Sequence, residues 1–391
     1  MSASAHAQAA FRLGGAVTLE GLDRDPHTIL ERLRREEPVT WVPALGGWLL
    51  TRYDDTIAVM RDAELFTVSD PRFSTAQVLG PSMLSLDGSE HRRHRFPFVT
   101  PFRSRAVVEA FAEDVAGGTA RLLDELVPAG AGELRRGFAG PLAAAIVARA
   151  LGFEPGEAGT VLRWYDAIVD AVTAITAGRP ITEAGRRAFA ELRSRLLAGI
   201  DRGSLLKEVA AHGGLSHEEI VSNAGVLLFG GVETTEGMIT NALLHLLERP
   251  ELLVAARSDR ALLDQSLEES LRFEPAAAVV DRYCTTGVSL RGAAIAPGEL
   301  VRVSIAGANR DPTVFPDPNR FDPARPNARR HLAFAHGPHN CVGVHLARLE
   351  GRTALAQLLE RLPNVRLDQA RRAPVRGLVF RKPATLHALW G

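Results

Sequence analysis

The run Phe334-Ala-His-Gly-Pro-His-Asn-Cys341-Val-Gly-Val-His-Leu-Ala-Arg348 surrounds one of the two cysteines in the chain. Gly337 and Gly343 frame Cys341, and an apolar helical pattern begins just behind it. Peptide N–H groups at a helix N-terminus can point at a sulfur atom and favour its thiolate form. The run therefore predicts one exposed thiolate presented to a flat ligand.

This run resembles the haem-binding signature of the cytochrome P450 family, Phe-x-x-Gly-x-His-x-Cys-x-Gly-x-x-Leu-Ala-Arg. The resemblance implies that Cys341 is the axial ligand of the iron of haem b, with the rest of the run forming its pocket. A thiolate ligand increases electron density on the iron and favours O–O cleavage. Ala335 stands where many members carry Gly, and we expect its methyl group to tilt the loop slightly. The positions that match the signature are Phe334, Gly337, His339, Cys341, Gly343, Leu346, Ala347 and Arg348.

Composition and charge narrow the class of protein. The chain has 391 residues, 46% hydrophobic and 24% charged, with a formal net charge of +0. The composition is ordinary for a globular protein, and the balanced charge suggests neither nucleic acid nor an anionic membrane as a partner. No apolar run is long enough to span a membrane, and residues 1–17 lack the features of a secretion signal. Two cysteines form no disulfide framework, so we expect a cytoplasmic protein.

Helical patterns dominate the chain, and short strand patterns occur near its two ends. We predict one mainly α domain over residues 1–391 with a small β region. The family resemblance implies the cytochrome P450 fold, with haem between the long central helix and the helix after the cysteine loop. The expected segments are a helix at 26–37, strands at 39–42, 48–51, 288–290 and 300–303, a loop at 66–86, helices across 90–271 and an irregular stretch at 311–330.

The longest predicted helix begins near Leu215 and ends near Glu248. Ser216 and Glu219 have the spacing of a capping box, and Arg249-Pro250 stops the helix. Gly230 and Gly231 lie in its middle, where each glycine costs about 1 kcal/mol relative to alanine. The pair indicates either close packing of a neighbouring helix or close approach of a planar ligand, with a local bulge that frees a carbonyl.

An acid and a hydroxyl follow the two glycines directly. The segment resembles the family motif Ala/Gly-Gly-x-Asp/Glu-Thr, which implies that Gly230 contacts the cofactor and that Glu233 and Thr234 deliver protons to bound dioxygen. Taken alone, Glu233 would be a solvated helix acid and Thr234 a hydroxyl bonded back to its own helix. The cysteine run favours the proton path.

Two further patterns are interpreted through the resemblance. Glu269 and Arg272 match the family's Glu-x-x-Arg motif, and Arg325 stands where a third partner of that ion network is expected. Such a network, once buried, loses much stability when one partner is removed.

Four cationic positions are expected to bind the haem propionates, since buried carboxylates require donors. His91 and Arg95 match the family segment Asp-x-x-Glu-His-x-x-x-Arg, while Arg282 and His339 match two further donors. His94 stands where an apolar residue is commoner. Without the resemblance, the basic cluster from His91 to Arg105 would be a solvated or phosphate-binding face; the balanced charge argues against phosphate.

The resemblance implies a monooxygenase that takes O2 and electrons from a separate ferredoxin and ferredoxin reductase. We expect the ferredoxin to dock on a basic patch that includes Arg92, Arg103, Arg348 and Arg352. The segments expected to face the substrate are largely small or aliphatic, which favours a small to medium apolar organic substrate. We expect a monomer.

Three alternatives remain open at this point. One is a peroxide-using enzyme of the same fold, and another is a haem-binding sensor without catalysis. The third is a zinc module, because four metal-capable residues occur within ten positions. These are His336, His339, Cys341 and His345.

Overall fold

The computed structural model describes residues 11–176, 179–200 and 205–391, so most of the segment tested for a secretion signal lies outside the described residues. The chain divides into two compact units. Unit 1 comprises Met1–Val68, Ser258–Cys341 and Ala373–Ala384, and unit 2 comprises Ser69–Arg257, Val342–Arg372 and Thr385–Gly391. The prediction of a mainly α chain with a small β region is confirmed. A single domain over 1–391 stays a prediction.

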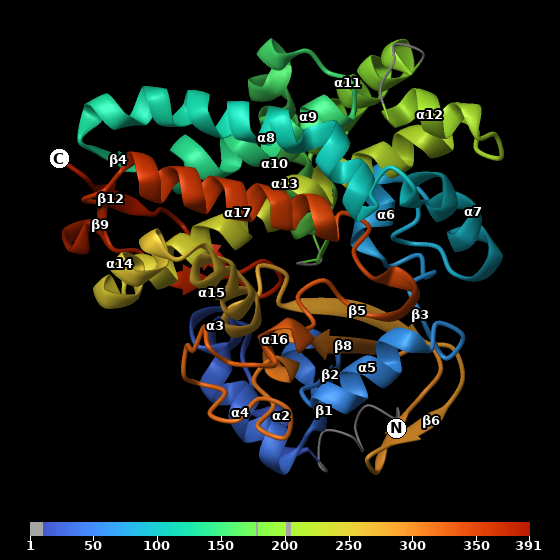
Figure 1. The fold of residues 1–391 in the computed structure, drawn as a ribbon. Helices are drawn as coiled ribbons and strands as arrows, with labels where there is room; N and C mark the ends of the chain where they lie inside the picture. Colours follow the sequence, from blue (N-terminus) through green and yellow to red (C-terminus); the bar gives the residue numbers. More distant parts are fainter. Residues whose placement is uncertain (1–10, 177–178, 201–204) are drawn as a thin grey trace. The chain divides into compact units, whose positions relative to one another are not determined.

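Unit 1 contains a five-stranded sheet, drawn in blue and orange in Figure 1. β2 pairs parallel with β8, and the other three pairings are antiparallel. Trp41, Trp48 and Phe315 lie in the core cluster that this sheet helps to form, so large aromatic side chains supply much of its buried area. In sheet order the strands are β1 (Val39–Val42), β2 (Gly47–Leu50), β8 (Leu300–Ser304), β5 (Val279–Cys284) and β3 (Phe66–Thr67).

Two helices of unit 1 begin at an aspartate whose side chain caps the first turn. Asp25 accepts the amide of Thr28 at the start of α4, and Asp259 accepts two amides at the start of α15. Strand expectations were partly correct, because β6 was predicted but β5 and β7 were missed. The remaining elements of unit 1 are α2 (Arg12–Gly15), α3 (Leu19–Arg24), α4 (Pro26–Glu36), α5 (Tyr53–Arg61), α15 (Arg260–Phe273), β6 (Val288–Leu290), β7 (Ala293–Ile295), α16 (Ile305–Ala308), β10 (Val375–Arg376) and β11 (Lys382–Pro383).

Unit 2 is built around one long helix, α13, which packs against α9, α10, α11 and α17. In Figure 1, α17 also runs alongside α8, with which it packs. A three-stranded sheet of order β4-β12-β9 joins distant parts of the unit. Its elements are α6 (Ser74–Leu79), α7 (Gly88–Val99), α8 (Ser104–Leu126), β4 (Ala131–Glu133), α9 (Gly140–Ala150), α10 (Ala158–Thr176), α11 (Glu183–Gly199), α12 (Leu205–Ala211), α13 (His217–Leu247), α14 (Pro250–Ser258), α17 (Val344–Arg361), β9 (Arg366–Leu367) and β12 (His387–Leu389).

Helix α13 follows its sequence signals closely. Both halves of the capping box between Ser216 and Glu219 are present, and the helix ends at Leu247, before Pro250 begins α14. The expected loop over residues 66–86 is wrong, because β3 and α6 lie within it. Within the described residues, every helix is too short or too polar to cross a membrane.

Candidate haem-thiolate site

Backbone hydrogen bonds within the cysteine loop hold it in a compact conformation. The amide of Cys341 donates to the carbonyl oxygen of Phe334 at 2.8 Å, and the amide of Asn340 donates to Gly337 at 3.1 Å. A 3-10 turn over Gly337–His339 joins these two bonds. Cys341 is half-buried, so its side chain is held by a short loop while part of it remains accessible.

Two residues of this loop adopt the left-handed backbone conformation. Gly337 has φ +75°, and a Cβ atom there would lie 2.4 Å from the carbonyl oxygen of Met60 in α5. Glycine is therefore required at this position by conformation and by space. Ala335 has φ 57°, a conformation that costs about 1 kcal/mol or more for a residue with a Cβ atom. Ala335 thus retains a backbone conformation that suits the glycine common in the family signature.

Helix α17 begins directly after the loop. Gly343 is its N-cap, and the amide of Ala347 donates to the Gly343 carbonyl at 2.9 Å. Cys341 therefore lies two residues before the N-cap, near the end of a helix where free amides and the helix dipole favour an anion. Gly343 has φ −86°, so its glycine identity does not follow from a left-handed backbone.

The two glycines of α13 have different surroundings. A Cβ atom on Gly231 would lie 2.6 Å from Cγ2 of Val147 in α9, so this glycine permits close helix packing. A Cβ atom on Gly230 would meet no heavy atom of the described residues within 4 Å. The packing interpretation is therefore confirmed for Gly231, while close approach of a planar ligand at Gly230 stays a prediction. Gly230 leaves the space that a planar ligand would need.

Glu233 and Thr234 follow on the same helix. Glu233 is 5% exposed, so the alternative of a solvated helix acid is wrong. The hydroxyl of Thr234 donates to the carbonyl oxygen of Gly230 at 2.6 Å, and the helix continues without a bulge through both glycines. The alternative of a back-bonding hydroxyl is therefore observed, and the expected bulge is wrong. Proton delivery by Glu233 and Thr234 stays a prediction.

Helix α7 carries the first pair of predicted propionate ligands. His91 is buried and Arg95 is half-buried, one turn apart on the helix. Both line a cavity of about 510 Å³. Three arginines give the cavity cationic groups that an anionic ligand could use, although most of its exposed lining surface is apolar. The other lining residues are Arg92, Arg93, Phe96, Pro97, Val99, His212 and Gly213.

The second pair of predicted propionate ligands lies in unit 1. Arg282 is a buried residue of β5 and donates from Nη1 to the carbonyl oxygen of Asp281 at 2.8 Å. His339 ends the 3-10 turn of the cysteine loop. A buried arginine requires acceptors, which is compatible with an acidic ligand group.

The predicted ion network forms within unit 1. Two parallel bonds of 2.7 and 2.8 Å join Arg272 to Glu269, and both side chains are 0% exposed. Nε of Arg325 lies 3.4 Å from Oε1 of Glu269. Nη1 of Arg272 also donates to the carbonyl oxygens of Asn309 and Pro318. The structure therefore joins α15 to the irregular stretch that precedes the cysteine loop.

Three buried polar residues of unit 2 were not identified from the sequence. Glu236 in α13 is paired with two arginines, Glu350 in α17 is buried without a cation partner among the described residues, and Asn223 in α13 bonds to α7. Each lies within an apolar helical run, where a polar residue must either find a partner or lose its charge. The sequence therefore showed that these residues were unusual, but it did not show which residues they contact.

The residues of the zinc alternative do not form a metal site. Among the described residues, the group of three potential ligands within reach of one ion is Glu90, His94 and Glu219. Nε2 of His336 instead accepts a bond from Nε of Arg61 at 2.8 Å. The zinc alternative is therefore wrong for the cysteine loop.

The donor set fits a haem group. Haem needs an axial ligand to iron, space beside its plane and cations for its propionates. Unit 1 supplies the thiol of Cys341 with Arg282, and unit 2 supplies the open space at Gly230 with the cationic cavity at His91 and Arg95. Each unit thus carries features that haem requires.

Comparisons with known proteins agree with this chemistry. A family model described as Cytochrome P450 matches residues 180–376. The chain is 35% identical to the cytochrome P450 monooxygenase PikC of Streptomyces venezuelae over 88% of this chain and 85% of that protein. It is 35% identical to nocardicin C N-oxygenase of Nocardia uniformis over 94% and 96%. The crystal structure of CalO2 superposes with a TM-score of 0.85 at 30% identity, over 96% of this chain and 99% of that one. The chain belongs to the cytochrome P450 family.

Proposed function

We propose that this cytochrome P450 monooxygenase takes electrons from a separate ferredoxin and ferredoxin reductase and oxidises a small to medium apolar organic substrate. Haem b is the family's cofactor, and O2 is its oxidant. The observation that carries the proposal is the half-buried Cys341 held by the Phe334 carbonyl beside the N-terminus of α17. Bound haem with a thiolate ligand supplies the chemistry that cleaves O–O and oxidises an organic substrate.

The proposed binding roles follow from the position of each side chain. In unit 1, Cys341 ligates the iron, Phe334 forms part of the loop around it, and Arg282 and His339 bind propionate; Gly343, which continues the loop, belongs to unit 2. In unit 2, His91 and Arg95 bind propionate, and Gly230 allows close approach to the α13 backbone. Burial of Arg282 supports its role, because a buried cation is stabilised by an anionic group.

The absorption spectrum of the reduced CO complex tests the thiolate ligand. Cys341→His should retain some haem but lose the red-shifted band typical of a thiolate ligand, together with oxygenation. Cys284→Ala is the matched control, because Cys284 is buried and its Sγ faces the Thr286 carbonyl instead. An unchanged band in Cys341→His would mean that another residue ligates the iron. A His-ligated sensor would lack the band already in the unmodified protein.

We propose that Glu233 and Thr234 conduct the protons that the reaction consumes. Burial of Glu233 supports this role, because a carboxylate away from bulk water can deliver protons selectively. Thr234→Ala should increase the share of reductant lost to peroxide. Thr240→Ala is the matched control, since the Thr240 hydroxyl makes the same 2.6 Å bond to the carbonyl four residues earlier. Equal coupling in both variants would remove Thr234 from the path.

The basic side chains of unit 2 support docking of an acidic ferredoxin. Arg92 and Arg103 are exposed, and Arg348 and Arg352 are half-buried on α17. Charge complementarity mainly increases the rate of association. Reversal of Arg92 and Arg103 to Glu should weaken turnover with ferredoxin and leave peroxide-driven turnover intact, while Arg260→Glu, at an exposed position of α15, should change neither. Equal losses with ferredoxin and with peroxide would refute docking at this face.

Two alternatives are less well supported. A peroxide-using member would replace the acid–alcohol pair, whereas Glu233 and Thr234 are both present. A sensor would not need that pair. We propose a cytoplasmic monomer, consistent with two cysteines that are not joined in a disulfide. Compounds that displace water from ferric iron shift its spin state, so a screen for such shifts would identify the substrate class.

A further inference from the structure

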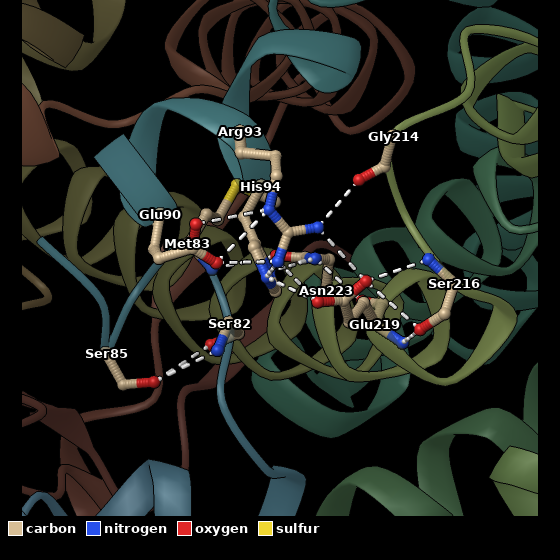
Figure 2. Close-up of polar contacts among 10 residues, drawn as sticks. All are labelled: Ser82, Met83, Ser85, Glu90, Arg93, His94, Gly214, Ser216, Glu219 and Asn223. Carbon is tan, nitrogen blue, oxygen red and sulfur yellow. Dashed lines mark hydrogen bonds and ion pairs between the residues drawn. The ribbon is translucent and has the colours of Figure 1, made fainter. Parts of the chain in front are cut away.

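A buried polar network holds helix α7 against the N-terminal part of α13, and it is shown in Figure 2. Asn223 of α13 is at its centre. Its Oδ1 accepts the amide of Met83 at 2.8 Å, and its Nδ2 lies 2.7 Å from the carbonyl oxygen of Glu219 and 3.0 Å from Nδ1 of His94. The network therefore joins three segments of unit 2: the chain before α7, α7 itself and α13.

The orientation of the Asn223 amide is determined by these partners. The Met83 amide can only donate and the Glu219 carbonyl can only accept, so Oδ1 and Nδ2 cannot exchange places. Nδ2 is thus the donor toward His94, and Nδ1 of His94 must accept. The proton of a neutral His94 consequently resides on Nε2.

The opposite edge of His94 meets an arginine and two acids. Nη2 of Arg93 lies 2.6 Å from Oε2 of Glu90 and 2.5 Å from Oε1 of Glu219, which uses both of its hydrogens. Nε2 of His94 lies 3.3 Å from the same Glu219 oxygen and can donate to it. Glu90, His94 and Glu219 could otherwise be ligands of a metal ion, but Arg93 Nη2 contacts all three. The guanidinium of Arg93 therefore occupies the position that a metal ion would take.

Charge and burial keep His94 neutral. Its side chain is 2% exposed, and burial, together with the charge of Arg93, lowers its pKa despite the opposing effects of Glu219 and Glu90. The bonds to Arg93 hold the pKa of Glu219 at about 2, so its carboxylate remains an acceptor. A proton on Nδ1 of His94 would face the Asn223 amide hydrogens and break the network.

We propose that His94 is a positioning residue for His91 and Arg95, the propionate ligands that share its helix; this rests on the proposed function. Neutral His94 accepts from Asn223 and so fixes the rotation of α7 and the position of the segment before it. Because His91 and Arg95 lie three residues before and one residue after His94, any shift of α7 moves them together. Positioning of α7 therefore depends on Nδ1 of His94 and its bond to Asn223.

Three substitutions separate the two ring nitrogens. His94→Asn keeps an acceptor near the position of Nδ1, His94→Gln keeps a donor near that of Nε2, and His94→Leu keeps neither. His217→Leu is the control, because His217 is an exposed histidine at the start of α13. Hydrogen exchange of the holoprotein and haem transfer to apomyoglobin are measured for each variant.

In His94→Leu, exchange over residues 82–99 and haem loss should both increase about tenfold, as expected when one buried hydrogen bond is broken. His94→Gln should behave similarly, while His94→Asn and His217→Leu should stay near the original protein. Acidification should loosen residues 82–99 in the original protein, and less so in His94→Asn. Equal exchange in His94→Asn and His94→Leu, or a uniform increase across α8 and α17, would overturn the proposal. Failure of the original protein to bind haem would instead refute the proposed function, and the exchange data would still test the network.

Discussion

Glu269 in unit 1 and Glu350 in unit 2 are both buried carboxyl groups, but they differ in their partners. Glu269 is 0% exposed and bonded to Arg272, with Arg325 close by. Glu350 is 2% exposed, and its Oε2 has no hydrogen-bond partner among the described residues. Burial raises the pKa of Glu350 well above its ordinary value. A buried acid thus either keeps its charge with a cation or keeps its proton.

Glu236 in α13 is intermediate between these two. Its side chain is 0% exposed, but its partners Arg135 and Arg136 are 15% and 40% exposed, at 3.2 and 3.5 Å. A Cβ atom on Gly140 would lie 2.6 Å from Oε1 of Glu236, so a glycine makes room for the carboxylate. The cations here extend toward solvent, whereas Arg272 does not.

Removal of Arg272 should have the largest effect, because it leaves Glu269 charged and buried. Arg272→Met should lower the free energy of unfolding by about 3–5 kcal/mol, as measured by chemical denaturation. Met keeps much of the volume, so lost packing contributes little. The double variant Glu269→Gln with Arg272→Met should recover part of the loss. A loss below about 1 kcal/mol in the single variant would contradict the idea that this charge depends on its partner.

Glu350 should give the folded protein a distinct pH dependence. Its folded pKa lies above its unfolded value, so the folded state binds more protons between the two and stability falls as pH rises. The slope can reach about 1.4 kcal/mol per pH unit in that interval. Glu350→Gln should remove this slope, as measured by denaturation at several pH values. Glu360→Gln, an exposed position of the same helix, should leave it unchanged; a slope that persists in Glu350→Gln would show that Glu350 is not its source.

Neutralisation of Glu236 should have a smaller effect than removal of Arg272. In Glu236→Gln, Arg135 and Arg136 lose an ion pair but can reach water, so we expect a loss of about 1–2 kcal/mol. Denaturation at neutral pH measures it. A loss as large as that of Arg272→Met would mean that exposure of the partners does not relieve a buried charge.

An exposed ion pair gives the lower limit of the comparison. Arg105 and Glu109 are 2.7 Å apart on α8, with side chains 91% and 62% exposed. Arg105→Ala should change the free energy of unfolding by less than about 0.5 kcal/mol, because solvent screens the pair. A larger change would indicate that distance, rather than burial, controls the strength of these pairs.

Local sequence patterns predicted the elements whose signals lie within a few residues. The capping box of α13, its end before Pro250, strands β1 and β6 and the spacing of Glu269 and Arg272 all depend on neighbours along the chain. The cysteine run also indicated the family, because many specified positions fall in one short segment. β5 was missed because Asp281 and Arg282 interrupt its apolar residues, and its pairing with β3 and β8 is not visible in the local sequence.

The sequence by itself determined the helical class, the family and the identity of the expected ligand, Cys341, since these depend on residue types at short spacings. Only the tertiary structure decided that, among the described residues, Gly231 packs against Val147 while Gly230 faces open space, and that Glu269 has cations where Glu350 has none. Two glycines, or two acids, are identical in a sequence. Their behaviour differs because burial and partner distance depend on segments that are far apart in the chain.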